Sequence, residues 1–499
     1  MQRMMSDDRR VLVIGSGPSG TAAALTLLRA GIPVTMLESG QGFPGGLLVR
    51  AMGRNVFRRR PRLEPQQRQT TSDDSDALSY RALVPGGLSN YWTGAVPRFA
   101  AEDFCEGERL HERYRWPVSY EDLVPYYEQV ERLLVVVGAP QDVPNLPASR
   151  VAYERQLPSR WQRVATRAEA FGQGLTTLPL ADGPPWMVRR TGTAFNSFTQ
   201  IVPLLRRFRQ FQLLRGAHAL RLEWSGEQKK VCSVIYFDRA ARTERRIAGA
   251  AVVVAAGALA STKLLLDSAC ADFPGGLGDT EGILGRYLHD HAHHWCVMDL
   301  DGALPRLGHA AYLTRAPYRE SPPLLAAQCT IGGSSESLRQ KALSFTPLKT
   351  KSFGVVIFGT MVPVYQHHVK PDETVKDEFG LPMLDIHLQY AEEVPRTIEA
   401  ARERLLAIMD AAGYRGTMRE PVAHLVPGSS VHFGGTVRMH SSPKHGMLNA
   451  WNRLHSVDNV AVVDASCFTT GVEKNPVPTA MALAVRAAHR LAEDLRISS

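Results

Sequence analysis

Residues 11–40 read VLVIGSGPSGTAAALTLLRAGIPVTMLESG, and their pattern is the strongest fold signal in this chain. Residues 11–15 form a short, continuous apolar run, as buried parallel strands do. Small and apolar residues then recur at helical spacing until Gly31, which ends the helix. A second apolar run follows and ends at Glu38. The pattern predicts a complete βαβ unit within about 30 residues.

The loop GSGPSG between the first strand and the helix matches the dinucleotide-binding pattern GxGxxG. Gly15 permits the tight turn, Gly17 lets the backbone approach a pyrophosphate, and Gly20 lets helix and strand pack closely. The helix N-terminus, which includes Ser19, offers free N–H groups to phosphates. Glu38 suits ribose hydroxyls and would repel a 2′-phosphate, which disfavours NADP. Because NAD and FAD share this signature, the loop alone leaves the two open.

Size and composition indicate a two-domain globular protein. The chain has 499 residues and a mass of 55.0 kDa, more than one ordinary core holds. It contains no apolar run long enough for a spanning helix, and its N-terminus lacks the apolar core of an export signal. Six cysteines without a CxxC pair are typical of reduced thiols. We therefore expect a cytoplasmic protein without a membrane partner, and a homo-oligomer stays open.

The net charge of +9 raises the question of a nucleic-acid partner. The densest basic run is Arg50–Arg62, within a polar stretch, 41–80, that is typical of a surface excursion. No nucleic-acid-binding motif accompanies this run, so we expect no nucleic-acid partner. The stretch GSSESL (333–338) lacks the context of a nucleophile elbow, which disfavours a serine hydrolase.

Further elements are predicted along the chain from apolar periodicity. The pattern predicts a helix over 117–137 broken at Pro125, strands within 231–239, 379–390 and 459–468, a strand, glycine turn and helix over 248–269, and helices near 395–413 and 479–495.

Four blocks in order carry a family resemblance. Besides 11–40 they are VPGGLSNYWTGAVPRF (84–99), VVVAAGALASTKLLLDSA (252–269) and a terminal block that joins HFGGTVRM (432–439) to VDNVAVVDASCFTTGVEKNPVPTAMALAVRAA (457–488). The segment LGRYLHDH (284–291) also resembles a family segment that follows the third block. Together they resemble the glucose–methanol–choline (GMC) oxidoreductases, FAD-dependent enzymes that oxidise primary or secondary alcohols. Block 84–99 is most similar to pyranose oxidases and bacterial glycoside oxidases, so the resemblance implies a sugar or glycoside substrate.

The resemblance also implies the architecture. It implies an α/β fold, α+β overall, with a Rossmann-like FAD-binding domain and an interleaved substrate domain on a mixed or antiparallel sheet. The expected boundaries are 1–135, 210–295 and 430–499 for the FAD-binding domain, and 136–209 and 296–429 for the substrate domain.

Cofactor-binding residues follow from the same resemblance. Block 84–99 would wrap the isoalloxazine ring, with Thr93 near its N5 atom. Pyranose oxidases carry a covalent flavin-attachment histidine where this chain has Tyr91, so FAD is expected to be bound noncovalently. The implied contacts outside the first loop are Gly86, Gly87, Asn90, Tyr91, Trp92, Thr93, Ala256, Gly257, Asp464, Ala465, Asn475, Pro476 and Thr479.

The catalytic pair implied by the family is His432 and Asn475. An imidazole suits a base that takes the hydroxyl proton near neutral pH, and a second polar group must align the hydroxyl. The plainer alternatives are a structural histidine for His432 and a turn residue before Pro476 for Asn475. His440 stands where the family usually has glycine, and we expect a structural role for it.

Three functional alternatives stay open. The alcohol could be a non-sugar compound, the protein could be a lyase that keeps FAD without net redox chemistry, or the Arg50–Arg62 run could have a nucleic-acid or membrane partner. The electron acceptor could be O2 or a quinone-type compound.

The run HDHAHHW (289–295) offers four histidines to a metal ion, but no further ligand set accompanies them, and we expect core or solvated histidines and no metal.

Overall fold

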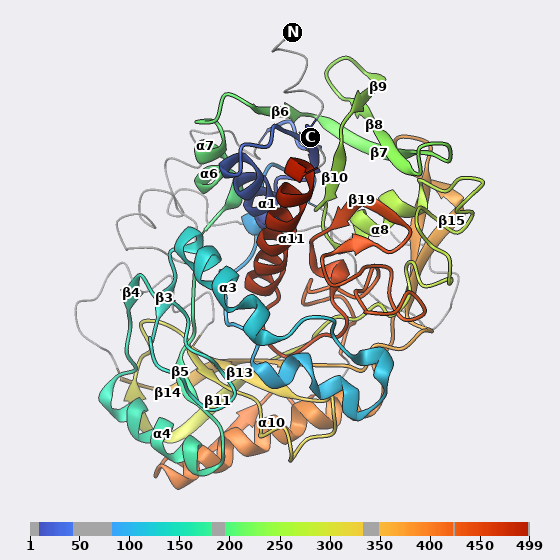
Figure 1. The fold of residues 1–499 in the computed structure, drawn as a ribbon. Helices are drawn as coiled ribbons and strands as arrows, with labels where there is room; N and C mark the ends of the chain where they lie inside the picture. The colour runs from blue at the N-terminus through green and yellow to red at the C-terminus, as the bar shows by residue number, and fades with distance from the viewer. Residues whose placement is uncertain (1–8, 43–81, 182–194, 333–348, 423–424, 498–499) are drawn as a thin grey trace.

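The computed structural model describes residues 9–42, 82–181, 195–332, 349–422 and 425–497 (Figure 1). Three expectations therefore lie outside the described residues. They are those for residues 43–80 of the predicted surface excursion, for the Arg50–Arg62 run within it, and for the stretch 333–338.

A six-stranded sheet carries the nucleotide-binding loop, and its spatial order is β18-β19-β10-β1-β2-β6. All neighbouring pairs are parallel except β18–β19. In chain order the five parallel strands run 5-4-1-2-3 across the sheet, which matches the first five strands of the Rossmann order 3-2-1-4-5-6. The strands are β1 (Val11–Ile14), β2 (Val34–Glu38), β6 (Phe211–Arg215), β10 (Ala251–Val254), β18 (Arg453–Leu454) and β19 (Val457–Val462).

Both faces of this sheet are covered, which explains the continuous apolar run of its first strand. Val11 and Val13 pack with one group of helices, whereas Leu12 and Ile14 face the other side. The first face carries α1 (Pro18–Arg29), α7 (Val202–Leu205) and α11 (Val477–Ile497), with α6 (Ser197–Gln200) beside α7. The second carries α8 (Ala258–Leu266) and the antiparallel strands β7 (Ala217–Ser225), β8 (Lys230–Asp238) and β9 (Thr243–Ala248).

The helix predicted over 117–137 is α3 (Tyr120–Leu134), and the predicted break at Pro125 is wrong. Pro125 is the sixth residue of the helix, so its missing N–H leaves the carbonyl of Glu121 without a helical partner. Glu121 is exposed, and water can satisfy that carbonyl. The helix begins with a capping box between Ser119 and Asp122.

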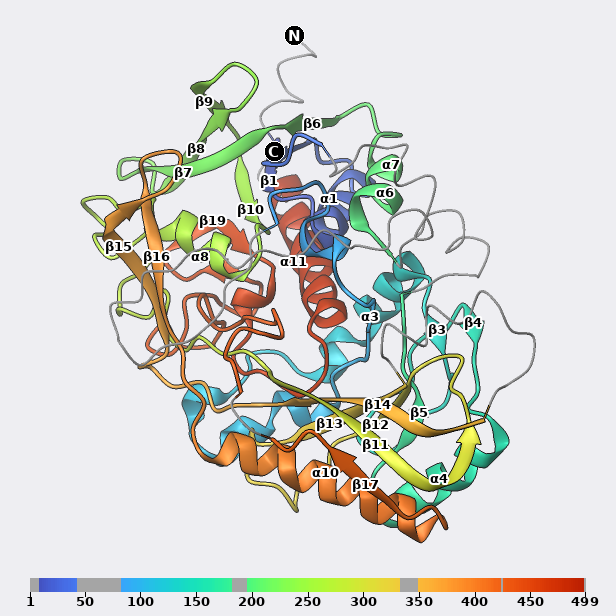
Figure 2. The ribbon, with the colours of Figure 1, turned by 180° about the vertical axis from the view of Figure 1, so that it is seen from behind.

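A second six-stranded sheet is antiparallel throughout, with the order β17-β11-β14-β13-β12-β5. Helices α4 (Ser159–Ala170) and α10 (Glu393–Ala411) pack on one face, and Figures 1 and 2 both show them at the end of the molecule away from α1. Its strands are β5 (Leu175–Thr177), β11 (Ala292–Pro305), β12 (Ala311–Leu313), β13 (Ala327–Ile331), β14 (Lys349–Gly359) and β17 (Gly416–Arg419). Together the two sheets confirm the expected α/β fold with a mixed and antiparallel sheet structure.

Smaller elements complete the described chain. The hairpin of β15 (His368–Lys376) and β16 (Pro382–His387) stands beside α8 (Figure 2), and β3 (Val137–Gly138) pairs with β4 (Tyr153–Glu154). Short 3-10 turns cover 87–90, 101–104, 106–109, 112–114 and 465–467. All six cysteines are described, and each is a free thiol. Among the helices in the described ranges, none has the length and apolarity that crossing a membrane requires.

Candidate active site

The nucleotide-binding loop has the geometry that its glycines predicted. Gly15 has a φ of +104°, and an added Cβ would lie 2.4 Å from the carbonyl oxygen of Ala255 on β10. A Cβ on Gly20 would lie 2.2 Å from the oxygen of Gly15. In contrast, a Cβ on Gly17, which caps α1, would meet nothing within 4 Å. The first and third glycines are therefore required by packing, whereas Gly17 leaves open space over the helix N-terminus.

Glu38, at the end of β2, is buried and bonded to the same loop. Its Oε2 accepts the backbone N–H and the hydroxyl of Ser16, and its Oε1 accepts the N–H of Gly40 at 2.6 Å. Burial raises the pKa of Glu38 above its ordinary value. Since a carboxylate oxygen can accept two hydrogen bonds, Oε1 keeps one site for a further donor.

The segment 84–99 is tied to the nucleotide-binding loop. The backbone N–H of Gly86 donates to Ser16 Oγ at 2.9 Å, and Gly86 and Gly87 both have positive φ angles. The Asn90 amide donates to two carbonyls of its own turn, and the indole of Trp92 donates to the carbonyl of Phe195. The segment is thus a defined turn held against the loop.

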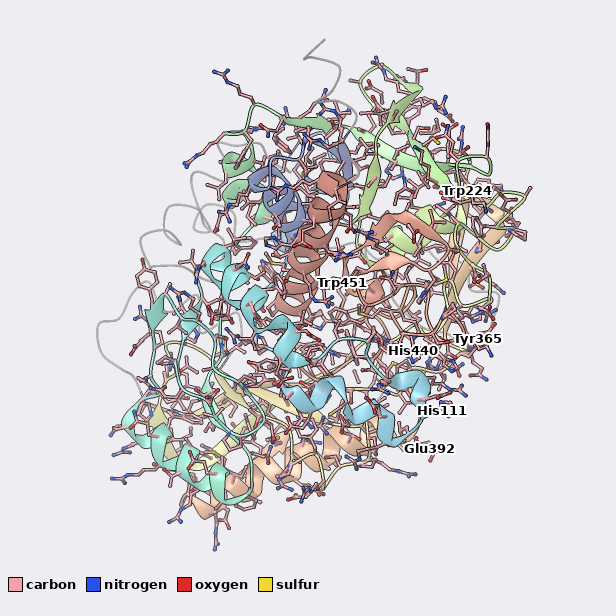
Figure 3. The ribbon with its side chains drawn as sticks, in the orientation of Figure 1. His111, Trp224, Tyr365, Glu392, His440 and Trp451 are labelled. Carbon is pink, nitrogen blue, oxygen red and sulfur yellow. The ribbon has the colours of Figure 1, made fainter. Side chains whose placement is uncertain are left out.

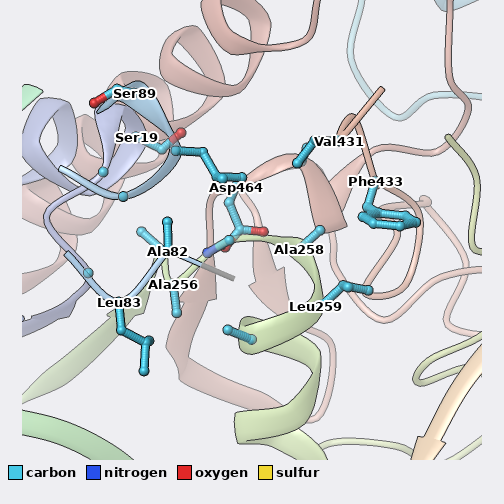
Figure 4. Close-up of a pocket in the computed structure, with 18 of the residues that line it drawn as sticks. Ser19, Ala82, Leu83, Ser89, Ala256, Ala258, Leu259, Val431, Phe433 and Asp464 are labelled. Atoms are coloured by element: carbon cyan, nitrogen blue, oxygen red, sulfur yellow. The ribbon is translucent and has the colours of Figure 1, made fainter. Parts of the chain in front are cut away.

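A cavity of about 530 Å³ joins these elements, within the size range of small-molecule and cofactor sites (Figure 4). In the view of Figure 4, Ser19 and Ala256 lie on the left, and Val431 and Phe433 lie on the right. The expected site residues that line the cavity are Gly15, Gly17, Ser19, Glu38, Gly87, Tyr91, Trp92, Thr93, Ala256, Gly257, His432, Asp464, Ala465, Asn475 and Pro476.

Four expected cofactor contacts do not line this cavity. Gly20 packs against Gly15, Gly86 contacts the side chain of Asn196, and Asn90 holds its own turn. The hydroxyl of Thr479 is hydrogen-bonded to the buried Tyr127 hydroxyl at 2.7 Å. These four residues lie behind the cavity wall and support the residues that line it.

Asp464 connects β19 to the start of α8 at the cavity wall. Its carboxylate accepts the N–H of Gly257 at 3.1 Å, the hydroxyl of Ser261, and both the N–H and the hydroxyl of Ser466. Burial raises its pKa. Asp464 therefore uses its hydrogen-bonding capacity to join the end of β19 to the start of α8, about 200 positions earlier in the sequence.

His432 and Asn475 meet at the same cavity although 43 positions separate them in the sequence. Asn475 Nδ2 lies 3.5 Å from His432 Nε2. The His432 ring also packs near Phe358 of β14, with centroids 5.5 Å apart. Desolvation lowers the pKa of His432 well below its ordinary value, so the ring is neutral at physiological pH.

Two residues that the sequence reasoning missed hold His432. The Asp290 carboxylate accepts the backbone N–H of His432 at 2.8 Å and the hydroxyl of Ser430 at 2.6 Å. The ring of His291 contacts the ring of His432 directly, with the two Nδ1 atoms 2.9 Å apart. Asp290 and His291 belong to the segment LGRYLHDH (284–291), and no local pattern relates them to a residue about 140 positions later.

A buried ion network holds the residues before Asn475. Lys474 donates to Asp103 at 2.8 Å and to Glu473 at 2.6 Å, and all three side chains are inaccessible to solvent. Arg315 binds Glu106 through two hydrogen bonds of 2.8 Å and lies 3.9 Å from Glu473. The sequence reasoning missed this network too, because a Glu-Lys pair in a loop is typical of a solvated surface.

The four histidines of the run 289–295 face four different neighbours. His289 packs under Gly434 and Gly471, His291 meets His432, His293 lies near Phe358, and His294 contacts the carbonyl of Glu420. Across the described ranges, no group of three or more His, Cys, Asp or Glu side chains is placed to hold a metal ion.

His440 lies apart from the cavity, on the side of the molecule where Figure 3 also labels His111. Its Nδ1 accepts the N–H of Ser442 at 2.9 Å, and its Nε2 is 3.1 Å from the carbonyl oxygen of Glu112. Both ring nitrogens therefore bond to the backbone, which agrees with a structural role.

Fold and cavity together define a dinucleotide-dependent oxidoreductase, with a Rossmann sheet at one end of the cavity and a histidine base candidate at the other. Comparison with family models gives the class. Residues 10–93 match an FAD dependent oxidoreductase model, and residues 86–293 and 368–484 match two models described as GMC oxidoreductase. The chain belongs to the GMC oxidoreductase family, and it is an FAD-dependent oxidoreductase that acts on CH–OH groups.

Individual relatives cover nearly the whole chain. The 6'''-hydroxyparomomycin C oxidase of Streptomyces lividus is 29% identical over 97% of this chain and 91% of its own length. The 2-methyl-1,2-propanediol dehydrogenase of Mycolicibacterium austroafricanum is 26% identical over 97% and 95%. Among solved structures, pyridoxine 4-oxidase from Mesorbium loti superposes with a TM-score of 0.67 at 18% identity, covering 97% of this chain and 99% of that one. This structural likeness confirms the fold.

The residues present fit FAD. The open space over Gly17 lets a pyrophosphate approach the N-terminus of α1, and the remaining acceptor site of Glu38 suits a ribose hydroxyl. The cavity continues from there past Tyr91 and Thr93 to His432.

Proposed function

We propose that this protein oxidises a hydroxyl of a sugar or glycoside to a carbonyl, with His432 as the general base. One observation carries the proposal: His432 Nε2 and Asn475 Nδ2 lie 3.5 Å apart on the wall of the cavity that the nucleotide-binding loop also lines. A base and an orienting amide within hydrogen-bonding reach of the same hydroxyl are what alcohol oxidation requires.

The protein's part of the reaction is to position the alcohol and take its proton. Neutral His432 has a free electron pair on one ring nitrogen, because burial disfavours its charged form. The Asn475 amide supplies both a donor and an acceptor, and it can hold the hydroxyl oxygen beside that nitrogen. The proton then passes from the hydroxyl oxygen to His432 Nε2.

FAD would be held by the nucleotide-binding loop, by Glu38 and by the segment 84–99. Bound FAD supplies the acceptor for the hydride that leaves the carbinol carbon. Tyr91 stands where related enzymes carry an attachment histidine, so we propose noncovalent binding.

Denaturation tests that binding mode. Precipitation of the yellow holoenzyme with acid should leave a colourless pellet and release all FAD into the supernatant, because no bond joins the flavin to Tyr91. A pellet that stays yellow after washing in denaturant would contradict noncovalent binding.

A sugar or glycoside is supported by two observations. Block 84–99 resembles pyranose oxidases and bacterial glycoside oxidases, and one relative is a 6'''-hydroxyparomomycin C oxidase. A second candidate is a less polar alcohol. It is supported by the apolar side chains Phe358, Phe433 and Met383 in the cavity wall, and by the 2-methyl-1,2-propanediol dehydrogenase relative.

Anaerobic reduction of the bound flavin distinguishes these candidates. The holoenzyme is mixed with monosaccharides, O- and C-glycosides and simple alcohols, and the loss of yellow absorbance is followed. Bleaching by sugars or glycosides supports the proposal, whereas bleaching by simple alcohols alone selects the second candidate. An unchanged flavin with every member of the panel would refute alcohol oxidation, and turnover without bleaching would indicate a lyase.

The base assignment has its own variant. His432→Ala should slow flavin reduction by at least about 100-fold, the low end of a general-base contribution, while the protein stays yellow. His445→Ala is the matched control, because its ring lies against His440 and His111 and outside the cavity. If His432→Ala reduces its flavin at the control's rate, another group is the base.

Three finer proposals accompany this function. The FAD-binding part comprises 1–135, 210–295 and 430–499, and the substrate part comprises 136–209 and 296–429, although α6 and α7 of the latter pack on the FAD-binding sheet. The oxidised substrate's electrons pass from the flavin to O2 or a quinone-type acceptor. A cytoplasmic location is supported by six thiols that form no disulfide.

A further inference from the structure

The ring of His432 has a second partner, at the nitrogen that faces away from Asn475. His291 Nδ1 lies 2.9 Å from His432 Nδ1, and the two ring planes stand at 76°. His291 itself is buried, with 4% of its surface accessible. Burial lowers the pKa of His291 to about 4 and that of His432 well below its ordinary value. At neutral pH each ring therefore carries a single proton.

The surroundings of the pair decide where those protons lie. The amide nitrogen of Asn475 can only donate, and it lies 3.5 Å from His432 Nε2, so Nε2 is the acceptor in that contact. The single proton of the neutral His432 ring is then on Nδ1, which donates to His291 Nδ1. His291 therefore carries its own proton on Nε2. The reverse arrangement would set two donors together at Asn475.

We propose that His291 is a positioning residue that holds His432 in the tautomer whose unprotonated Nε2 faces Asn475 and the cavity. The inference rests on the proposed function, since it explains how His432 can act as the base. When Nε2 takes the hydroxyl proton, the His432 ring becomes a cation, and its Nδ1–H remains bonded to His291. That bond stabilises the cation in a site where burial opposes it.

Two residues just before β11 hold His432 by hydrogen bonds. Asp290 accepts its backbone N–H, and His291 accepts its ring N–H. The hydroxyl of Tyr390 donates to the carbonyl of His291 at 3.0 Å and fixes that backbone in turn. The titratable side chains that face His432 are therefore Asp290 and His291 from this segment and His293 from β11.

Two substitutions separate positioning from packing. His291→Phe keeps a ring but removes the acceptor, whereas His291→Asn offers a side-chain oxygen near the position of Nδ1. His294→Phe is the matched control, because His294 is on the same segment but contacts the carbonyl of Glu420. Flavin absorbance first establishes that each variant retains FAD.

The kinetic test uses methyl β-D-glucopyranoside and 1,2-propanediol as probe alcohols from about pH 3 to 9, because burial lowers the pKa of His432 well below its ordinary value. We expect His291→Phe to reduce its flavin about 10- to 100-fold more slowly with less than about threefold change in KM, as loss of an orienting partner does. The acid limb of this variant's pH profile of flavin reduction should move to lower pH, because the His432 cation loses its hydrogen-bond acceptor. His291→Asn should restore at least part of the rate of flavin reduction and part of the wild-type position of the acid limb. A His291→Phe profile identical to the control's, or His291→Asn no better than His291→Phe, overturns the proposal.

A second measurement needs no substrate. Ring ¹⁵N chemical shifts of the FAD-loaded protein, labelled in histidine, report which nitrogen is protonated, and the loss of one signal set in His432→Gln assigns it. We expect a protonated Nδ1 and an unprotonated Nε2 on His432 in the wild type, and a mixture in His291→Phe. A wild-type His432 protonated at Nε2 overturns the inference. If no member of the alcohol panel reduces the wild type, the proposed function fails, and the ring shifts still decide the tautomer.

Discussion

Replacing Lys474 by methionine tests the buried ion network beside Asn475. The substitution keeps the side chain's length and removes its charge. The carboxylates of Asp103 and Glu473 are both inaccessible to solvent, and they would then lose the cation that they share. Removing one partner from a buried ion pair costs about 3–5 kcal/mol, because the remaining charge stays desolvated. We expect a loss of that size in the free energy of unfolding, measured by urea denaturation of the holoenzyme at pH 7.

The pH dependence follows from the two pKa shifts. Nearby carboxylates raise the pKa of Lys474, so its contribution is present below 10.5 and is lost as pH rises through the higher value in the folded protein. Lys474 and Arg315 lower the pKa of Glu473, so its contribution is present above 4.5 and is lost as pH falls through the lower folded value. The wild type should therefore keep its full stability advantage over Lys474→Met between pH 4.5 and pH 10.5.

Two further variants make this reasoning refutable. Arg396→Met breaks an ion pair with Glu392 whose side chains are 71% and 83% exposed, and it should cost less than about 0.5 kcal/mol. Adding Asp103→Asn to Lys474→Met removes one uncompensated carboxylate and should recover at least about 1 kcal/mol. If Lys474→Met costs no more than Arg396→Met, or if the double variant is less stable than the single one, the network is not held together by charge.

Two other predictions concern the nucleotide-binding loop and Asp290. Gly15→Ala should abolish both folding yield and FAD binding, because its Cβ meets the Ala255 oxygen at 2.4 Å at a φ of +104°. Gly17→Ala should fold normally, with a native circular dichroism spectrum, but bind FAD weakly; equal FAD content in the two variants would contradict these roles. Burial raises the pKa of Asp290 from 3.8 to about 6, so its contribution to wild-type stability is lost as pH rises between those values. The stability of Asp290→Asn relative to the wild type should rise over the same pH interval. If the urea midpoints of the two proteins differ by the same amount at pH 4 and at pH 7, the raised pKa of Asp290 is refuted.

The sequence predicted those parts of the site that depend on local pattern. The βαβ unit and the roles of Gly15 and Gly20 follow from spacing, because a turn and the packing next to it are set within a few residues. The contact between His432 and Asn475 came from family resemblance, since each lies in an irregular loop. Both line the cavity as expected.

The remainder of the site depends on tertiary packing. The contact between His291 and His432 exists because the start of β11 lies beside the loop before Phe433, and periodicity reports neither position. Thr479 was expected at the cofactor, but its hydroxyl is occupied by Tyr127 from another helix. Pro125 was expected to break its helix, yet an exposed neighbouring carbonyl tolerates it.

The packing of α1 against α11 has a consequence for biosynthesis. Helix α1 ends at Arg29, whereas α11 begins at Val477, and the two share one apolar core. At roughly 5–20 residues per second, the ribosome needs roughly 20–90 s to make the intervening chain. During that time the face of α1 that α11 covers lacks its permanent partner. The nascent protein must shield this surface by other means, and the cofactor can be loaded into a finished site only near the end of translation.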